Sequence, residues 1–189
     1  MKGEGGSSRA PFSLFTFHVS RFTFLFIPMS FPSSGRLLGV DWGEIRFGLA
    51  LSDESQTLAT PLETLVRRAG KRFPMPRFLE ILGAHAPVGI VVGLPLALAG
   101  DEGESAAAAR EVAAAIARRS GLPIELWDER MSTARALAAI REQGGSTRGR
   151  RAEVDALAAA VVLQHFLDAR RAEKAVRTER AVRSEEAES

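Results

Sequence analysis

Apolar residues recur along the chain with two kinds of spacing, which divide it into strand-like and helix-like segments. Short apolar or alternating runs predict strands at residues 36–41, 47–52, 57–65, 89–94 and 124–127. Helical spacing predicts helices at residues 76–85, 105–119, 132–143 and 153–169. We expect Ser105 and Ser132 to cap the second and third of these helices. From residue 170 onward the pattern becomes a mixed-charge tail, for which we expect a frayed and solvated helix.

The order of these segments indicates the fold class. Gly43 lies in the short connection between the first two strands, which favours an antiparallel hairpin. The fully apolar stretch GIVVGL, residues 89–94, is instead typical of strands in parallel sheets. Three strands followed by helix, strand, helix, strand and two helices therefore predict an α/β protein with a mixed sheet flanked by helices.

The first 34 residues differ from the rest of the chain. They are rich in Phe, but His18, Arg21, Pro28 and Pro32 interrupt the apolar run, which is too broken to span a membrane. A basic residue in mid-segment also argues against a signal peptide. We interpret residues 1–34 as an extension, or as residues ahead of a true start at Met29. The domain then covers residues 35–168, and residues 169–189 form the charged tail.

Composition narrows the function classes. The chain has 189 residues, which is enough for one domain, and it has no Cys. Disulfides, a thiolate nucleophile and a Cys-based metal site are therefore excluded, in keeping with a reducing cytoplasm. The net charge is +2, and nearly all of the positive charge is Arg, whose planar guanidinium suits phosphate. This composition permits a nucleic-acid partner without requiring one.

Three carboxylate positions stand out. Asp41 closes the first strand, Asp128 and Glu129 close the last strand, and Asp155 lies on the apolar side of the last predicted helix. A carboxylate facing a core is costly unless it is paired, and a divalent metal such as Mg²⁺ is one such partner. Carboxylates from two strand ends and one helix suit metal-assisted phosphodiester cleavage.

Each of these residues also has a simpler interpretation. An Asp at a strand end is often a turn former or a helix cap. Asp128 and Glu129 stand beside Arg130, with which either can pair. Asp155 can cap its own helix or meet Arg150 or Arg151.

Five motifs in a fixed order resemble the YqgF/RuvX family. They are GVDWGEIRFGLALSD (39–53), PLETL (61–65), IVVGLPL (90–96), ELWDERMST (125–133) and VDALAAAVVLQHFLD (154–168). The resemblance implies an RNase H-like fold with a five-stranded mixed sheet between helices. It also implies a metal-dependent nuclease for the 5′-end processing of pre-16S ribosomal RNA, related to Holliday junction resolvases.

The resemblance places acidic site residues at Asp41, at the DER motif and at Asp155, with Mg²⁺ or Mn²⁺ as the metal. Because Asp128 and Glu129 point to opposite sides of a continuing strand, only one of them faces the metal. We favour Glu129, with Asp128 as the alternative. Asp53, after the second strand, is expected to be structural.

Glycines, tryptophans and arginines complete the expected site. Gly43 and Gly48 either let backbone pass close to it or are simple hairpin glycines. Trp42 is a candidate for base stacking, and Trp127 for core packing. Contacts to a nucleic-acid backbone are expected from Arg46, Arg148, Arg150 and Arg151.

Two rivals to the RNA nuclease remain open at this point. A resolvase of branched DNA would use the same chemistry, and it would need two symmetric cuts and hence a dimer. A ribosome-assembly factor would bind nucleic acid without cutting it. The sequence leaves open whether the protein is a monomer or a homodimer, and it predicts no membrane partner.

Overall fold

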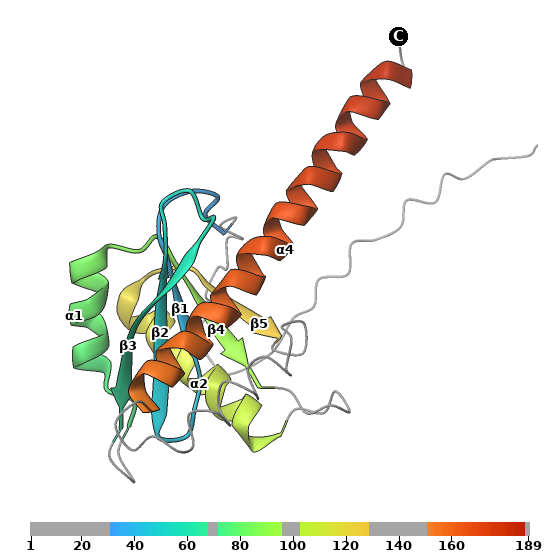
Figure 1. Cartoon of the computed structure of the whole chain (residues 1–189). Coiled ribbons are helices and arrows are strands. Elements are labelled where there is room, and N and C mark those ends of the chain that lie inside the picture. Colours follow the sequence, from blue (N-terminus) through green and yellow to red (C-terminus); the bar gives the residue numbers. More distant parts are fainter. Residues whose placement is uncertain (1–30, 68–71, 96–102, 129–150, 188–189) are drawn as a thin grey trace, which may run out of the picture.

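A five-stranded sheet forms the centre of the computed structural model, which describes residues 31–67, 72–95, 103–128 and 151–187. Its strands are β1 (Leu37–Asp41), β2 (Arg46–Ser52), β3 (Ala59–Val66), β4 (Gly89–Leu94) and β5 (Ile124–Asp128). Their order in the sheet is β3-β2-β1-β4-β5 (Figure 1). β1 and β3 are each antiparallel to β2, whereas β1, β4 and β5 run parallel. The predicted hairpin and mixed sheet are thereby confirmed.

Helices cover both faces of this sheet. They are α1 (Met75–His85), α2 (Glu104–Ser120) and the 37-residue α4 (Arg151–Ala187), labelled as in Figure 1. Alternate strand residues feed two cores, as the two-residue period of a strand requires. Leu38, Val40 and Val92 pack in a core with α1 and α2, while Leu37 and Val91 pack against α4. This arrangement confirms the predicted RNase H-like layout.

Glycines set how closely α4 lies on the sheet. A Cβ on Gly39 would come within 2.8 Å of the Leu163 Cβ, and one on Gly48 would overlap the carbonyl oxygen of Asp155. Both glycines are therefore needed because helix atoms occupy the space of a side chain. The first turns of α4 consequently lie directly over β1 and β2.

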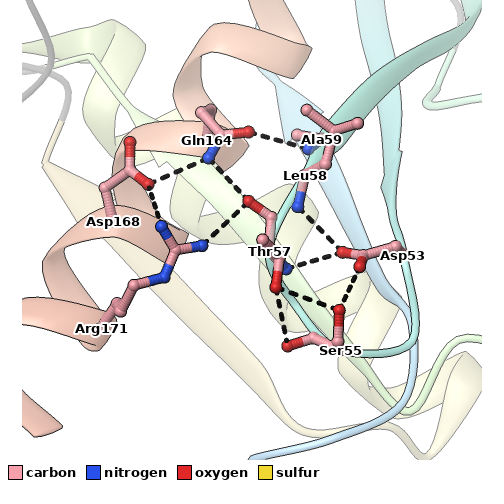
Figure 2. A network of polar contacts seen from close by, with 8 residues as sticks. All are labelled: Asp53, Ser55, Thr57, Leu58, Ala59, Gln164, Asp168 and Arg171. Atoms are coloured by element: carbon pink, nitrogen blue, oxygen red, sulfur yellow. Dashed lines mark hydrogen bonds and ion pairs between the residues drawn. The ribbon is translucent and has the colours of Figure 1, made fainter.

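A polar network pins α4 to the connection between β2 and β3 (Figure 2). The Gln164 Oε1 accepts a hydrogen bond from the Ala59 backbone N–H at 2.9 Å, and its Nε2 donates to the Thr57 carbonyl at 3.0 Å. Arg171 donates to the same carbonyl at 3.1 Å and pairs with Asp168. These contacts fix the position of the helix along the sheet.

Asp53 organises the same connection from the strand side (Figure 2). Its Oδ1 accepts hydrogen bonds from the backbone N–H groups of Thr57 and Leu58, at 2.6 and 2.9 Å, and its Oδ2 accepts one from the Ser55 hydroxyl. The hydrogen bonds from Leu58, Ser55 and Thr57 lower the pKa of the Asp53 carboxyl from 3.8 to about 2. Asp53 is thus structural, as predicted.

One expectation about helix ends is wrong. Ser105 does not cap α2, because the helix begins at Glu104 and its N-cap is Gly103, without a side-chain cap. The chain from residue 170 is an exposed helix, as expected, and α4 continues to Ala187. It contains strong helix formers and neither Gly nor Pro. The helix predicted at 132–143 lies outside the described residues.

Part of the segment assigned to the extension is packed on the domain. The Phe31 ring meets the Phe166 ring edge-on at 5.6 Å, and the Arg170 guanidinium lies over both rings. Arg170 also donates to the Pro32 carbonyl at 2.8 Å. Within the part of the chain that the structure describes, no helix is both long and apolar enough to cross a membrane.

Candidate active site

Asp41 is a buried carboxylate at the end of β1. Asp41 is only 5% exposed. Alternation places it on the α4 face, like Gly39 two residues earlier. Gly48 is paired with Asp41 in the antiparallel strands β1 and β2, so both residues face the same side of the sheet.

Asp155 reaches the same place from α4. The backbone of Asp155 lies over Gly48, the residue paired with Asp41. The glycine thus brings a helix carboxylate above a strand carboxylate, although the two residues are far apart in the sequence. The structure confirms that Asp155 turns inward, since its side chain is only 19% exposed.

Arg46 is the observed partner of Asp155. The Arg46 Nε lies 2.6 Å from the Asp155 Oδ2. The two atoms are close enough for an ion pair but are not aligned for a hydrogen bond. Of the partners expected from the sequence, Arg150 and the side chain of Arg151 lie outside what the structure describes. Because Arg46 precedes Gly48 by two residues, strand alternation puts both on the α4 face. That spacing was the sequence signal for this pair.

A pocket of about 400 Å³ opens beside these residues. The segment from Asp41 to Arg46 lines it, together with Pro95 after β4, Ser105 in the first turn of α2, and Asp155. Ser105, expected as a helix cap, is thus a lining residue. The tight turn between β1 and β2 requires a glycine at position 43, because a Cβ there would overlap the Arg46 carbonyl oxygen.

The end of β5 presents its carboxylate to the other face. Leu126 packs with the α1 and α2 core, while Trp127 packs with α4 and meets the Phe166 ring at 5.3 Å. Alternation therefore puts Asp128 on the face opposite Asp41 and Asp155. Glu129 lies outside the described residues. Among the residues that are described, no group of three His, Cys, Asp or Glu side chains is placed to share a metal ion.

The remaining predicted residues divide into three groups. Trp127 is a core residue as expected, whereas Trp42 is only 8% exposed, packs in the other core and also borders the pocket. Arg148 and Arg150 lie outside the described residues. Arg151 is the first residue of α4, and its side chain is not described.

Comparison with known proteins gives one family and many relatives. The family described as "RuvX: Holliday junction resolvase" matches residues 35–169. A "Putative pre-16S rRNA nuclease" of Anaeromyxobacter sp. (strain Fw109-5) is 46% identical over 137 residues, covering 72% of this chain and 99% of that protein. A protein of the same name from Leifsonia xyli subsp. xyli is 45% identical over 139 residues, covering 74% and 89%.

Solved structures show a more distant likeness. The Thermus thermophilus RuvC structure superposes with a TM-score of 0.48 at 18% sequence identity. The superposition covers 72% of this chain and 96% of that one.

Proposed function

The chain belongs to the RuvX family, and from this membership we propose that it is a metal-dependent endonuclease that processes the 5′ end of pre-16S ribosomal RNA. Its relatives carry the name of pre-16S rRNA nuclease at up to 46% identity over nearly their whole length. The reaction is hydrolysis of a phosphodiester bond.

The observation that carries the proposal is the meeting of Asp41 and Asp155 around Gly48. A buried strand end and a long helix each bring one carboxylate to the same side of the sheet, beside an open pocket. A purely structural pair would be expected to fill this space with packed side chains. The pocket therefore supports a role in binding and chemistry.

The donor set fits a hard divalent cation. Carboxylate oxygens are the ligands that Mg²⁺ and Mn²⁺ prefer, and the described residues that line the pocket include neither His nor Cys. Asp41 and Asp155 would hold the ion, with Glu129 as the third ligand. A divalent ion bound there supplies the charge stabilisation and water activation that phosphodiester cleavage requires.

Alternation along β5 supports Glu129 rather than Asp128 as that third ligand. Trp127 lies on the α4 face, so a strand continuing by two residues would turn residue 129 to this face. Asp128 would then serve the turn after β5.

Arg46 has a second role in this proposal. Its side chain is 39% exposed, and it holds the Asp155 carboxylate only by an ion pair without hydrogen-bond alignment. An ion that took over Asp155 would free Arg46 for a phosphate of the substrate, which its planar donors suit. Such a contact would position the backbone without reading sequence.

Asp41→Asn tests the proposal with the least change in shape. The variant should keep its fold and its affinity for RNA, while Mg²⁺- or Mn²⁺-dependent cleavage of a precursor RNA is abolished. Asp168→Asn is the matched control, since it removes an exposed carboxylate on the same helix outside the pocket. An Asp41→Asn protein that cuts as fast as its parent would overturn the mechanism, because cleavage would then not depend on Asp41. A parent that binds the RNA but never cuts it would instead be a non-catalytic RNA-binding factor.

Cleavage of branched DNA is the second candidate, because the matched family is described as Holliday junction resolvase. The same carboxylates would serve either polymer. Cleavage of a precursor RNA and of a four-way DNA junction, measured side by side with the same metal, decides between them. Symmetric paired cuts by a dimer would favour the DNA substrate.

A further inference from the structure

The outer half of α4 is a feature that the family match does not cover. The match ends at residue 169, whereas the helix continues to Ala187 and projects away from the sheet (Figure 1). Every residue from Arg171 to Ala181 is exposed. This segment adds nothing to either core, so its sequence is free to serve a partner.

Basic side chains follow one another along this projecting segment. Lys174, Arg177, Arg180 and Arg183 are spaced three residues apart, which makes each a neighbour of the next on a helix surface. Among the described side chains, none of these four lies within ion-pair distance of a carboxylate. Residues 170–183 contain six basic residues against two acidic ones, Glu173 and Glu179. We call Lys174, Arg177, Arg180 and Arg183 the basic stripe.

The segment offers little to an apolar partner. Val176 is the one large hydrophobic residue that the structure describes as exposed beyond residue 170. A coiled-coil seam needs apolar residues at every third or fourth position, and a membrane-surface helix needs a wide apolar face. Neither is present among the described side chains, so the charges point to a polyanion.

The base of the projecting segment is held firmly. Arg170 donates hydrogen bonds to the carbonyls of Phe31 and Pro32, and it stacks over the rings of Phe31 and Phe166. Arg171 bonds to the Thr57 carbonyl and pairs with Asp168. The helix therefore leaves the domain in a fixed direction, with the stripe at a fixed distance from the pocket.

We propose that the basic stripe binds the phosphate backbone of the substrate at a point remote from the cut, which rests on the proposed nuclease function. At 1.5 Å per residue, Lys174 lies about 29 Å and Arg183 about 42 Å along the helix from Asp155. Only a substrate that extends this far can touch both places. The stripe therefore selects long structured RNA over short fragments, through charge and length and not through sequence.

The test compares a neutralised variant with a charge-preserving one in the full chain. The first carries Lys174→Gln, Arg177→Gln, Arg180→Gln and Arg183→Gln, and the second carries Arg177→Lys, Arg180→Lys and Arg183→Lys. Gln, Lys and Arg have similar helix propensities, so both variants should keep α4. Binding is measured by fluorescence anisotropy without metal, on an RNA duplex of about 8 base pairs, too short to reach from the pocket to Lys174, and on one of about 30 base pairs, long enough to reach Arg183.

The neutralised variant should bind the long duplex about tenfold more weakly or worse, and its slope of log Kd against log salt should fall by about 3. The charge-preserving variant should match the parent. The short duplex should bind equally to all three proteins, because it cannot reach the stripe from the pocket. Cleavage by the neutralised variant at saturating RNA should proceed at the parental rate.

Equal affinity and equal salt dependence of the three proteins on the long duplex would overturn the inference. A neutralised variant that loses affinity only for vesicles containing anionic lipid, and not for RNA, would also overturn it and would assign the stripe to a membrane surface. The nuclease proposal fails separately: if the parent never cuts RNA yet the binding difference persists, the stripe stands as an RNA-binding surface without catalysis.

Discussion

Arg46 and Asp155 form the link between the hairpin and the long helix, with 2.6 Å between the Arg46 Nε and the Asp155 Oδ2. The pair joins a strand start to the helix turn that lies over Gly48. It also occupies a carboxylate that the proposed metal needs. Cation and guanidinium are thus competitors for one side chain, and this competition can be measured.

Arg46→Gln should bind Mn²⁺ roughly threefold to tenfold more tightly than the parent, because a positive charge near the ion is removed. Its affinity for RNA should fall at the same time, since a phosphate contact is lost. Titration with Mn²⁺ followed by electron paramagnetic resonance measures the first effect. Arg36→Gln is the control, as it removes an exposed Arg before the opposite end of β1. Weaker Mn²⁺ binding by Arg46→Gln would mean that Arg46 positions Asp155 instead of competing for it.

Gly48→Ala should destabilise the protein by about 1–3 kcal/mol, because the new methyl group meets the Asp155 carbonyl oxygen and α4 must move. Metal binding should weaken with it, as the two carboxylates separate. Urea unfolding gives the free energy. Gly83→Ala in α1 is the matched control: apart from the helix's own backbone and the adjacent residues, no described atom lies within 4 Å of its added Cβ, so a gain of about 0.5–1 kcal/mol is expected.

Gln164→Ala should lower the free energy of unfolding by about 1–3 kcal/mol, because the Ala59 N–H loses its acceptor and the Thr57 carbonyl loses one of its two donors. The cleavage rate should fall too if the network sets the position of α4. Chemical unfolding and single-turnover cleavage separate the two effects. Arg171→Gln is the milder comparison, since Gln164 still holds the same carbonyl; an equal loss in both variants would contradict this assignment.

Asp53 should make stability depend on pH in the acid range. Its pKa is about 2 in the folded protein against 3.8 for the free group, so folding favours the ionised carboxyl. This contribution is fully present above about pH 4 and is lost as the pH falls toward 2. Asp53→Asn should therefore melt a few degrees lower at pH 6, with the gap closing near pH 2.

Thermal melting of Asp53→Asn, the parent and Glu54→Gln between pH 6 and pH 2 makes this comparison. Glu54 is an exposed neighbour whose ion pair with Arg36 spans 3.6 Å, so its substitution should change the melting temperature little. A gap between Asp53→Asn and the parent that stays constant down to pH 2 would show that the hydrogen bonds act without the charge.

Strand positions were the most predictable part of the fold. GIVVGL needed no tertiary information, because a fully apolar run can only be buried on both faces. The inward turn of Asp155 was also readable, from its place on an apolar helical stripe. The partner of Asp155 was harder, since Arg46 is distant in the sequence and only the packing of α4 on the sheet brings it close.

Helix ends were less predictable. Ser105 was a reasonable cap by residue type, yet the chain entered the helix one residue before it, through the extended backbone of Gly103. The segment after residue 170 has no apolar stripe that faces a core. The spacing of its apolar residues therefore could not predict its conformation. Local propensity and the anchoring by Arg170 settle its conformation.

Neither Gly nor Pro interrupts α4, so the helix has no hinge residue between its two ends. It is therefore a stiff rod that packs on β1 and β2 at Gly39 and Gly48. The outer half of the helix and Asp155 are accordingly parts of one rigid element, so whatever the outer half binds is held at a constant separation from the pocket.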